Sequence, residues 1–475
     1  MVLFYLRLLT CFVAILTLSC TESPGIPHPT DRLHFPGALA ADPNGDYLYV
    51  VSSNFDLRYR GGAVTAIDLN THRLIEQGVI GIGDFGGQLV LYEPPPDGDD
   101  STPRLVGYLP SRSEGRLYWF EVNGGQADAP LRLGCNEEGP TEGGGIQECD
   151  NSHRVGRVER KRLPFDDQNL DEDARASLAG RPVSMSVGLD AVGTMIYPGV
   201  GDLEDHLIIT NPRTGRVSAF HIQGGMPMSP STPGAPAHDD DFDDSVLSRP
   251  GQPVFLENRV VSGGAYDLAL SPSDGLVYTT NRFAGLVVPL ELNAHPDPAG
   301  LPRTWTEIAI GDPFAIPSSG TASDHGRSML FSLSGNLAYL SYRNPSGVVV
   351  IDTSLDSTGK RRNKVLGSIG VGAGPARLAA AKSGQDGREL LYVVCFGAEQ
   401  IWVVDPVLLT VVDIIDLPGG PFDLAIVDNP ERGRFRAYVS MFELEAVAVI
   451  DLDRESPFYH QVIAYIRGGH EGGVQ

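Results

Sequence analysis

The sequence predicts an all-β protein, a seven-bladed β-propeller with four short antiparallel strands in each blade. Three observations lead to this prediction. Residues 374–417 contain four β-type runs, among them Leu390 to Val394 and Ile401 to Asp405. Residues from Gly420 onward repeat the same order of runs and turns. Comparable units recur along the chain at roughly 45 to 50 residues, a period typical of propeller blades packed around an axis.

Each unit can be placed by one apolar residue of its first strand, which follows a turn that contains glycine or proline. These anchors are Leu39, Leu89, Met185, Leu268, Met329, Leu378 and Leu424. The second strands are expected at residues 47–52, 104–109, 207–211, 276–281, 337–342, 390–395 and 437–440, all rich in β-branched and aromatic residues. Ring closure should bring the first and last units together. The run from Arg32 to Phe35 is a candidate for an added strand beside residues 462–466.

Composition and charge limit the classes of function. The chain has 475 residues, of which 41% are hydrophobic and 20% charged, as in a folded globular protein. Its net charge of −24 argues against binding to a phosphate backbone, which needs clustered lysine and arginine. We therefore expect no nucleic-acid partner, and we expect a monomer.

The N-terminus reads as an export signal. Residues 1–19 contain an apolar run from Leu8 to Leu18 that is too short to span a bilayer. The run ends at Ser19-Cys20, which resembles a bacterial lipobox and implies a lipid on Cys20. Residues 20–31 would then be a proline-containing spacer between the membrane and a propeller at residues 32–470. The lipobox pattern prefers leucine where this chain has Thr17, so ordinary cleavage and secretion is the alternative to a lipid anchor in the cell envelope, periplasmic or surface-facing.

The remaining cysteines divide into a pair and a single residue. Cys135 and Cys149 flank a glycine-rich loop, and disulfides form in exported chains, so we expect a bridge between them. Cys11 leaves with the signal peptide. Cys395 lies in an apolar strand and is expected to be a buried core residue.

Several second strands share a short motif. It occurs as Tyr278-Thr279-Thr280-Asn281, as residues 208–211 and, in part, as residues 49–52. Together with the turn at residues 42–45 and the Ile-Asp or Val-Asp ends of third strands, this motif resembles the YVTN family of β-propeller repeats. The resemblance covers nearly all of the mature chain and implies a bacterial surface or periplasmic propeller, a group of diverse functions. It is weakest in the second unit, where residues 105–108 replace the motif.

Two insertions interrupt the repeats, at residues 136–180 and 224–253. Long loops on a rigid ring often bind partners, and flexibility is the other common explanation. The second insertion carries the acidic residues Asp239, Asp240, Asp241, Asp243 and Asp244. Their carboxylates could bind calcium, but the spacing does not match an EF-hand loop, so a solvated charge cluster is the preferred interpretation. The sequence contains no paired-histidine zinc motif and no haem attachment motif, so we expect no other cofactor.

Any site is expected where the first strands begin, because these strands line the central channel and their leading ends converge. The polar residues there, candidates for binding or catalysis, are Gln88, Ser184, Tyr266, Asp267, His325, Arg327, Arg377 and Asp423. The catalytic candidates among them are His325, Arg327, Asp267 and Asp423, from which a general base oriented by a carboxylate could be built. No nucleophile motif supports catalysis, and a structural ring of hydrogen bonds explains such residues equally well.

The function that these features favour is a binding platform in the cell envelope, for a protein or glycan partner. The alternative is an envelope hydrolase or lactonase-like enzyme with its site at the mouth of the channel.

Overall fold

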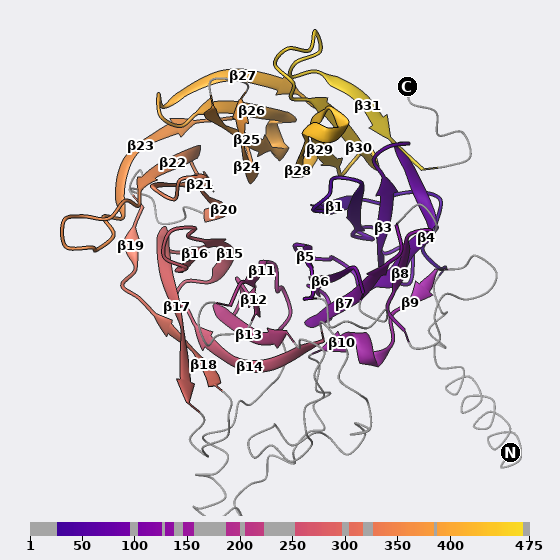
Figure 1. Ribbon diagram of the computed structural model, residues 1–475, viewed down its shortest axis with the longest axis horizontal. Helices are drawn as coiled ribbons and strands as arrows, with labels where there is room; N and C mark the ends of the chain where they lie inside the picture. The colour runs from indigo at the N-terminus through magenta and orange to yellow at the C-terminus, as the bar shows by residue number, and fades with distance from the viewer. Residues whose placement is uncertain are drawn as a thin grey trace, which may run out of the picture.

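Seven β-sheets form a closed ring around a central axis in the computed structural model of the protein (Figure 1). The structure describes residues 26–95, 103–125, 129–136, 146–155, 187–199, 205–222, 252–296, 304–316, 326–383 and 387–468. Within each sheet the main strands are antiparallel and follow one another in sequence order from the axis outward. This arrangement confirms the predicted seven-bladed β-propeller. Among the described residues, no helix is long and apolar enough to cross a membrane.

In blades 1 and 2, additional short strands make the outer edge of the sheet irregular. Blade 1 consists of β1 (Pro36–Ala41), β2 (Tyr47–Ser52), β3 (Gly62–Asp68) and β4 (Arg73–Ile82), with β9 (Gln147–Glu148) added in parallel to β4. Blade 2 consists of β5 (Val90–Tyr92), β6 (Leu105–Ser111) and β7 (Arg116–Asn123), with β8 (Arg132–Gly134) and β10 (Arg154–Val155) both paired to β7. Blade 3 consists of β11 (Thr194–Tyr197), β12 (His206–Thr210), β13 (Arg216–Ile222) and β14 (Pro253–Val260).

The remaining blades are more regular. Blade 4 consists of β15 (Ala265–Leu270), β16 (Val277–Asn281), β17 (Leu286–Pro296) and β18 (Thr304–Ile310), with β19 (Phe314–Ala315) also paired to β17. Blade 5 consists of β20 (Gly326–Phe331), β21 (Leu337–Arg343), β22 (Ser346–Asp352) and β23 (Lys364–Gly370). Blade 6 consists of β24 (Pro375–Ser383), β25 (Arg388–Cys395), β26 (Gln400–Asp405) and β27 (Thr410–Asp416). Blade 7 consists of β28 (Pro421–Asn429), β29 (Arg434–Met441), β30 (Ala446–Asp451) and β31 (Val462–Ile466). Short 3-10 helices lie at η1 (Asn151–His153), η2 (Phe396–Ala398) and η3 (Pro430–Arg432).

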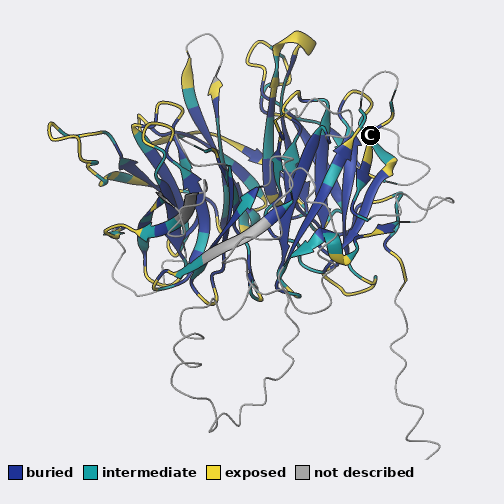
Figure 2. Cartoon of the chain, turned by 60° about the horizontal axis from the view of Figure 1, so that its bottom comes forward, coloured by how far each residue is buried: buried dark blue, intermediate teal, exposed yellow. Residues whose placement is uncertain are grey.

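Two features of the repeat motif explain this regularity. In six blades a tyrosine of the second strand is buried between neighbouring sheets; these residues are Tyr49, Tyr108, Tyr278, Tyr339, Tyr392 and Tyr438. The second feature is the aspartate that ends many third strands, whose side chain accepts hydrogen bonds from backbone N–H groups of the following turn. Asp405, for example, accepts hydrogen bonds from the backbone N–H groups of Val407 and Leu408, at 3.0 and 2.9 Å. The inner strands are buried, and exposed residues lie in turns and on outer strands such as β23 and β27 (Figure 2).

Two details differ from the sequence-based expectation. The first strand of blade 3 is Thr194–Tyr197 and not a strand around Met185, which lies outside the described residues. The error arose because the long insertion precedes this strand and hides the register of the repeat. Residues 32–35 also form no strand on blade 7, although Leu33 packs in the same apolar cluster as Ala464 and Ile466.

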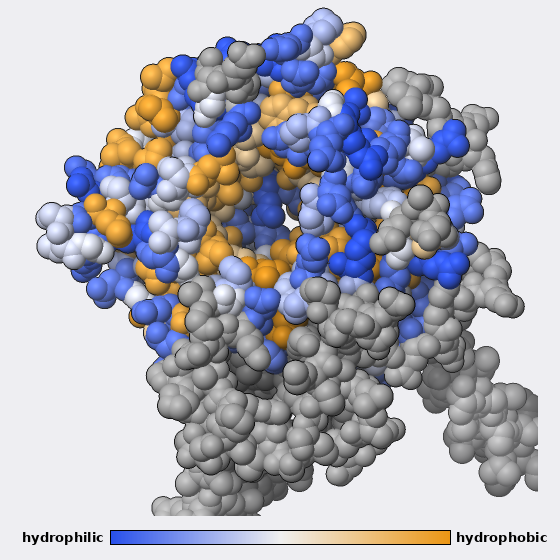
Figure 3. Space-filling model, viewed as in Figure 1, coloured by the Kyte–Doolittle hydropathy of each residue, from blue (hydrophilic) through white to orange (hydrophobic). Residues whose placement is uncertain are grey.

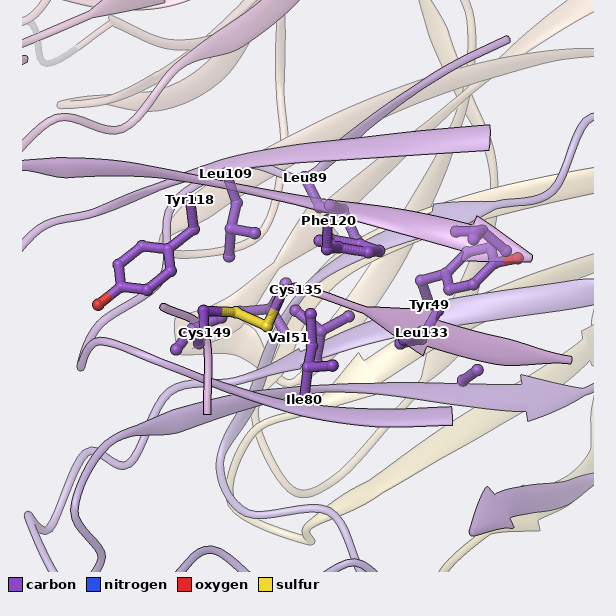
Figure 4. Packing of buried hydrophobic residues seen from close by; sticks show 14 of the residues in the cluster. Tyr49, Val51, Ile80, Leu89, Leu109, Tyr118, Phe120, Leu133, Cys135 and Cys149 are labelled. Atoms are coloured by element: carbon purple, nitrogen blue, oxygen red, sulfur yellow. A yellow bond between two sulfur atoms is a disulfide. The ribbon is translucent and has the colours of Figure 1, made fainter. Parts of the chain in front are cut away.

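The predicted disulfide is present between Cys135 and Cys149, which are both buried (Figure 4). Cys135 directly follows β8 of blade 2, and Cys149 directly follows β9, which pairs with β4 of blade 1. The bridge therefore fixes a segment that crosses between the outer edges of two neighbouring blades. Around it lie Val51 and Ile80 of blade 1 and Phe120 of blade 2 (Figure 4). Cys395 is buried and unpaired, as expected.

The ring closes between blades 7 and 1 through side chains and not through a shared sheet. The side chain of Arg434 donates a hydrogen bond of 2.5 Å to the carbonyl of Gly45. Ser440 donates one of 2.6 Å to the carbonyl of Gly37. An apolar cluster that includes Leu48, Val50, Tyr438 and Val449 fills the space between the two sheets.

The segment 26–35 covers this junction and is held by two histidines. His34 contacts Asp56 of blade 1 at 2.8 Å and Glu445 of blade 7 at 2.5 Å. His28 is buried beside Tyr59, its Nδ1 lies 2.8 Å from the carbonyl of Pro29, and its Nε2 has no hydrogen-bond partner in the described structure. Burial lowers the pKa of His28 to about 4, against a partial opposing effect of the Pro29 carbonyl.

We expect acid to release this segment. Because the pKa of His28 is about 4 in the folded protein and about 6.5 in an unfolded chain, protonation favours the released state. The free energy that holds residues 26–35 on the ring should be unaffected above about pH 6.5. It should fall as the pH drops toward 4, by about 2 kcal/mol at pH 5. Hydrogen exchange of residues 26–35, corrected for the intrinsic rate, should be about 30-fold less protected at pH 5 than at pH 7.5. His28→Gln should remove that difference, and an unchanged pH response in this variant would contradict the assignment to His28.

Candidate functional site

Four of the predicted residues meet in one polar layer across the channel. They come from blades 2, 4, 6 and 7 and are Gln88, Asp267, Arg377 and Asp423. Gln88 donates to Oδ1 of Asp267 at 2.5 Å, and Arg377 lies 3.4 Å from the same oxygen. The Nε of Arg377 also lies 3.0 Å from Oδ1 of Asp423. The layer therefore joins side chains of four blades across the axis.

The oxygens of this layer are already bonded to the backbone. Asp423 accepts from the N–H groups of Leu39 and Leu424, at 3.0 and 2.8 Å. Asp267 accepts from Met329 N–H at 2.9 Å, and Gln88 accepts from Thr194 N–H at 3.0 Å. These N–H groups belong to first strands, and three of the four lie in the neighbouring blade. Those of Leu39, Met329 and Leu424 directly follow a register irregularity at the start of the strand. The layer thus ties side chains of four blades to the backbone at the starts of the first strands.

Arg377 supplies the positive charge that balances the two aspartates of this layer. Asp267 and Asp423 are buried, with side-chain exposures of 4% and 7%, whereas the Arg377 side chain retains 27%. Burial opposes the positive charge of Arg377, but the two carboxylates outweigh it and raise the pKa of the guanidinium. Two carboxylates committed to an arginine and to backbone N–H groups are poorly placed to act as a general base.

Past the polar layer, an open pocket of about 500 Å³ is lined mostly by apolar residues. It lies between the first strands of blades 7, 1, 2 and 3, and Leu39, Leu91, Ile196 and Ile426 are among its lining residues. Figure 3 shows the ring hollowed at its centre, with hydrophilic groups visible inside the hollow.

One face of the ring, here called the mouth face, carries the start of each first strand and the end of each second strand. On this face, arginines gather at blades 4 and 5. The ring of Tyr266 has the guanidinium carbon of Arg327 at 4.7 Å and that of Arg282 at 6.0 Å from its centre. Arg343 ends β21, and its Nε lies 3.4 Å from the carbonyl of Pro375. Burial and then repulsion by Arg327 lower the pKa of both Arg282 and Arg343.

Phenylalanines gather on the same face at blades 6, 7, 1 and 2. This phenylalanine cluster consists of Phe35, Phe55, Phe85, Phe396, Phe422 and Phe442. Neighbouring ring centres lie 5.1 to 6.3 Å apart, from Phe35 and Phe442 to Phe396 and Phe442. Phe55 and Phe422 remain 58% and 40% exposed.

Two of these phenylalanines have backbone conformations that other blades give to glycine. Phe35 and Phe85 precede their first strands with φ of 48° and 55°. At the equivalent positions of blades 4, 6 and 7 stand Gly264, Gly374 and Gly420, with φ of 89°, 70° and 71°. A bulky residue in this left-handed region costs about 1 kcal/mol or more, and such strain concentrates at functional sites. The conformation places aromatic rings on the mouth face that a glycine could not supply.

Other predicted site residues lie outside the described residues. These are Ser184, His325, the lipidation candidate Cys20, and the calcium candidates Asp239, Asp240, Asp241, Asp243 and Asp244. Because the first strand of blade 3 begins at Thr194, Gly193 and not Ser184 occupies the polar-layer position of that blade. In the described part of the chain, no group of three or more His, Cys, Asp or Glu residues could hold a metal ion.

The sequence reading missed Arg282, Arg343 and the phenylalanine cluster. A signal was present, since the residue four positions after the buried tyrosine of each second strand lies on the mouth face. That position holds Arg112, Arg282 and Arg343 in blades 2, 4 and 5, and Phe396 and Phe442 in blades 6 and 7. At this position of the repeat, therefore, blades 2, 4 and 5 carry cations and blades 6 and 7 carry aromatic rings.

Comparison with known proteins finds the same fold in solved structures. The periplasmic gluconolactonase of Pseudomonas aeruginosa is 16% identical with a TM-score of 0.50, over 83% of this chain and 89% of that chain. Hydrazine synthase of Kuenenia stuttgartiensis is 13% identical with a TM-score of 0.49, over 91% and 99%. A putative 6-phosphogluconolactonase from Bacteroides uniformis is 15% identical with a TM-score of 0.48, over 83% and 88%. No protein-family model and no curated protein sequence matches this chain.

At these identities the likeness concerns the fold alone. The class that the fold and the site define is a seven-bladed β-propeller, similar in architecture to lactonase-type propellers, with a hydrogen-bonded polar layer across its channel.

Proposed function

We propose that this protein is a binding propeller of the cell envelope, and that the phenylalanine cluster on its mouth face is the surface on which a protein partner docks. The observation that carries the proposal is the exposure of Phe55 and Phe422 within a continuous group of rings. Exposed apolar patches mark interaction sites, and aromatic residues dominate the binding energy of protein interfaces. The strained backbone at Phe35 and Phe85 supports a role beyond folding.

A protein partner fits these rings better than a glycan. Phenylalanine offers no hydrogen-bonding group, and the rings of this cluster mostly meet edge-on or tilted, so they do not form a flat platform for stacked sugars. Interface cores between proteins are rich in such residues and poor in charge.

The test compares capture of envelope proteins by the purified propeller and by the double variant Phe55→Ser, Phe422→Ser. A partner enriched by the unmodified protein should be lost with the variant, with at least a tenfold weaker affinity. Phe458→Ser is the matched control, because Phe458 is 55% exposed and follows β30, whose end lies at the opposite face. Equal capture by both variants would remove the cluster from the proposal, and capture of a glycan alone would replace the protein partner.

The alternative of a lactonase-like enzyme makes a different prediction. A lactone or hydrolase panel on the purified domain should then show turnover that is lost in Asp267→Asn or His325→Ala. The commitment of Asp267 and Asp423 to backbone N–H groups and Arg377 favours binding over catalysis. Robust turnover would overturn the binding proposal.

We also propose that the protein is exported and held at the membrane by a lipid on Cys20. The disulfide supports an oxidising compartment. Labelled acyl chains should attach to the unmodified protein and not to Cys20→Ala, and an unlabelled protein would leave secretion as the explanation.

A further inference from the structure

We propose that Arg282, Arg327 and Arg343, grouped around Tyr266, form a carboxylate-binding site on the mouth face. This site deepens the proposed function, because it names an acidic group that the partner would present beside the phenylalanine cluster. It rests on residues of blades 4 and 5 that the phenylalanine cluster does not include.

The first argument is the missing counter-charge. Within the described ranges no ion pair joins any of these three arginines to a carboxylate, although the chain as a whole carries a net charge of −24. Asp190, whose charge acts on Arg282, contacts Arg112 and Arg213 at 3.7 and 3.6 Å. Three cations gathered in a strongly acidic protein therefore lack a described partner that could neutralise them.

The second argument is the burial of Arg327. This residue is only 9% exposed, and its Nε is buried without a hydrogen-bond partner among the described residues. A buried charged donor without an acceptor is costly, so such a group indicates that an acceptor binds there. Stacking on Tyr266 holds the guanidinium in place but supplies no hydrogen-bond acceptor in the plane of its N–H groups.

The third argument concerns geometry and access. Arg282 and Arg343 are half-buried and flank Arg327, and Arg282 also lies 5.2 Å from the ring of Phe283, which is 50% exposed. Repulsion by Arg327 acts on both arginines, so a bound anion would relieve both. The planar fork of a guanidinium matches the two oxygens of a carboxylate, which makes this group the best fit.

The test measures binding of two synthetic peptides, hexaglutamate and hexaglutamine, to the purified full chain at low and high salt. Hexaglutamate should bind and hexaglutamine should not, and the affinity should fall as salt rises. Arg327→Gln should weaken hexaglutamate binding at least tenfold, and Arg327→Lys should recover only part of it because the fork is lost. Arg132→Gln, which removes an exposed arginine of β8 in blade 2, is the charge-matched control and should bind as the unmodified protein does.

Further arms separate the possible sources of the anion. Oligogalacturonate tests carboxylates of sugars, and tighter binding of this probe than of hexaglutamate would assign the site to an acidic glycan. Stronger binding of inorganic phosphate than of either carboxylate would overturn the carboxylate assignment. Asp324 precedes Arg327 in the sequence and lies outside the described residues, so Asp324→Asn tests whether the chain supplies its own carboxylate. The inference falls if only that variant binds hexaglutamate, or if Arg327→Gln and Arg132→Gln behave alike.

The outcome is separable from that of the proposed function. Loss of partner capture in the phenylalanine variant with no binding of hexaglutamate would leave the docking surface and remove the anion site. Binding of hexaglutamate without any captured partner would leave the anion site and remove the docking surface.

Discussion

Replacing Arg377 by methionine should lower the free energy of unfolding by about 3 kcal/mol. The change leaves Asp267 and Asp423, both almost fully buried, without the cation that lies between them. Removing one partner of a buried ion pair is strongly destabilising because the other charge stays buried and unpaired. The hydrogen bonds that both aspartates accept from backbone N–H groups moderate the loss, as does the 27% exposure of the Arg377 side chain. Equilibrium unfolding in urea measures the difference.

The matched control is Arg132→Met, which removes an exposed arginine with no described ion pair and should change stability by less than about 0.5 kcal/mol. The triple variant Arg377→Met, Asp267→Asn, Asp423→Asn should recover part of the loss, because the unpaired charges are gone as well. Additive losses in this variant would show that the charge of Arg377 is not coupled to those of the two aspartates, and would contradict the explanation given for the first prediction.

Removing the disulfide should lower the free energy of unfolding by about 3 kcal/mol, the value of the chain-entropy model for a loop of this length. In Cys135→Ser, Cys149→Ser the sequence separation of 14 residues is no longer closed by a covalent bond. Because β9 pairs with β4 only over Gln147 and Glu148, we expect this strand to detach first and to expose the outer edge of blade 1. Hydrogen exchange at the backbone N–H of position 149, which donates to the carbonyl of Gly81, reports that step.

The control is Cys395→Ser, since Cys395 is buried in blade 6 and forms no bridge. Reductant should lower the stability of the unmodified protein and of this control alike, and should not affect the double serine variant. Equal stability with and without reductant in the unmodified protein would contradict the expected contribution.

The repeated elements of the fold were predictable because each blade buries the same pattern. Leu39, Leu378 and Leu424 are buried in the first strands of their blades, as their positions in the repeat required. Blade 3 was misplaced because its first strand, Thr194–Tyr197, follows a long insertion and lacks the usual leucine. Cys135 and Cys149 could be paired from their spacing, whereas the parallel pairing of β9 with blade 1 has no local sequence signal.

The site was predictable only in part. Position in the repeat placed Gln88, Asp267, Arg377 and Asp423 at the channel, but which of them touch depends on side-chain lengths across the axis. Arg282 and Phe442 follow second strands, and the sequence analysis singled out neither of them. Only a comparison of equivalent positions in all blades shows that the turns of the mouth face gather arginines at blades 4 and 5 and aromatic rings at blades 6 and 7.

In the described part of the chain, blade 7 takes all of its strands from residues 421–466 and none from the segment that precedes blade 1. During synthesis, the apolar side of blade 1 that contacts blade 7 therefore stays uncovered while roughly 380 further residues are added. This takes about 20 to 80 s at ordinary elongation rates. Leu48, Val50 and Ile67 stay without their final neighbours throughout this interval. The nascent chain is thus a substrate for holding chaperones until its last strand is made, and a product truncated before β28 is expected to aggregate or be degraded.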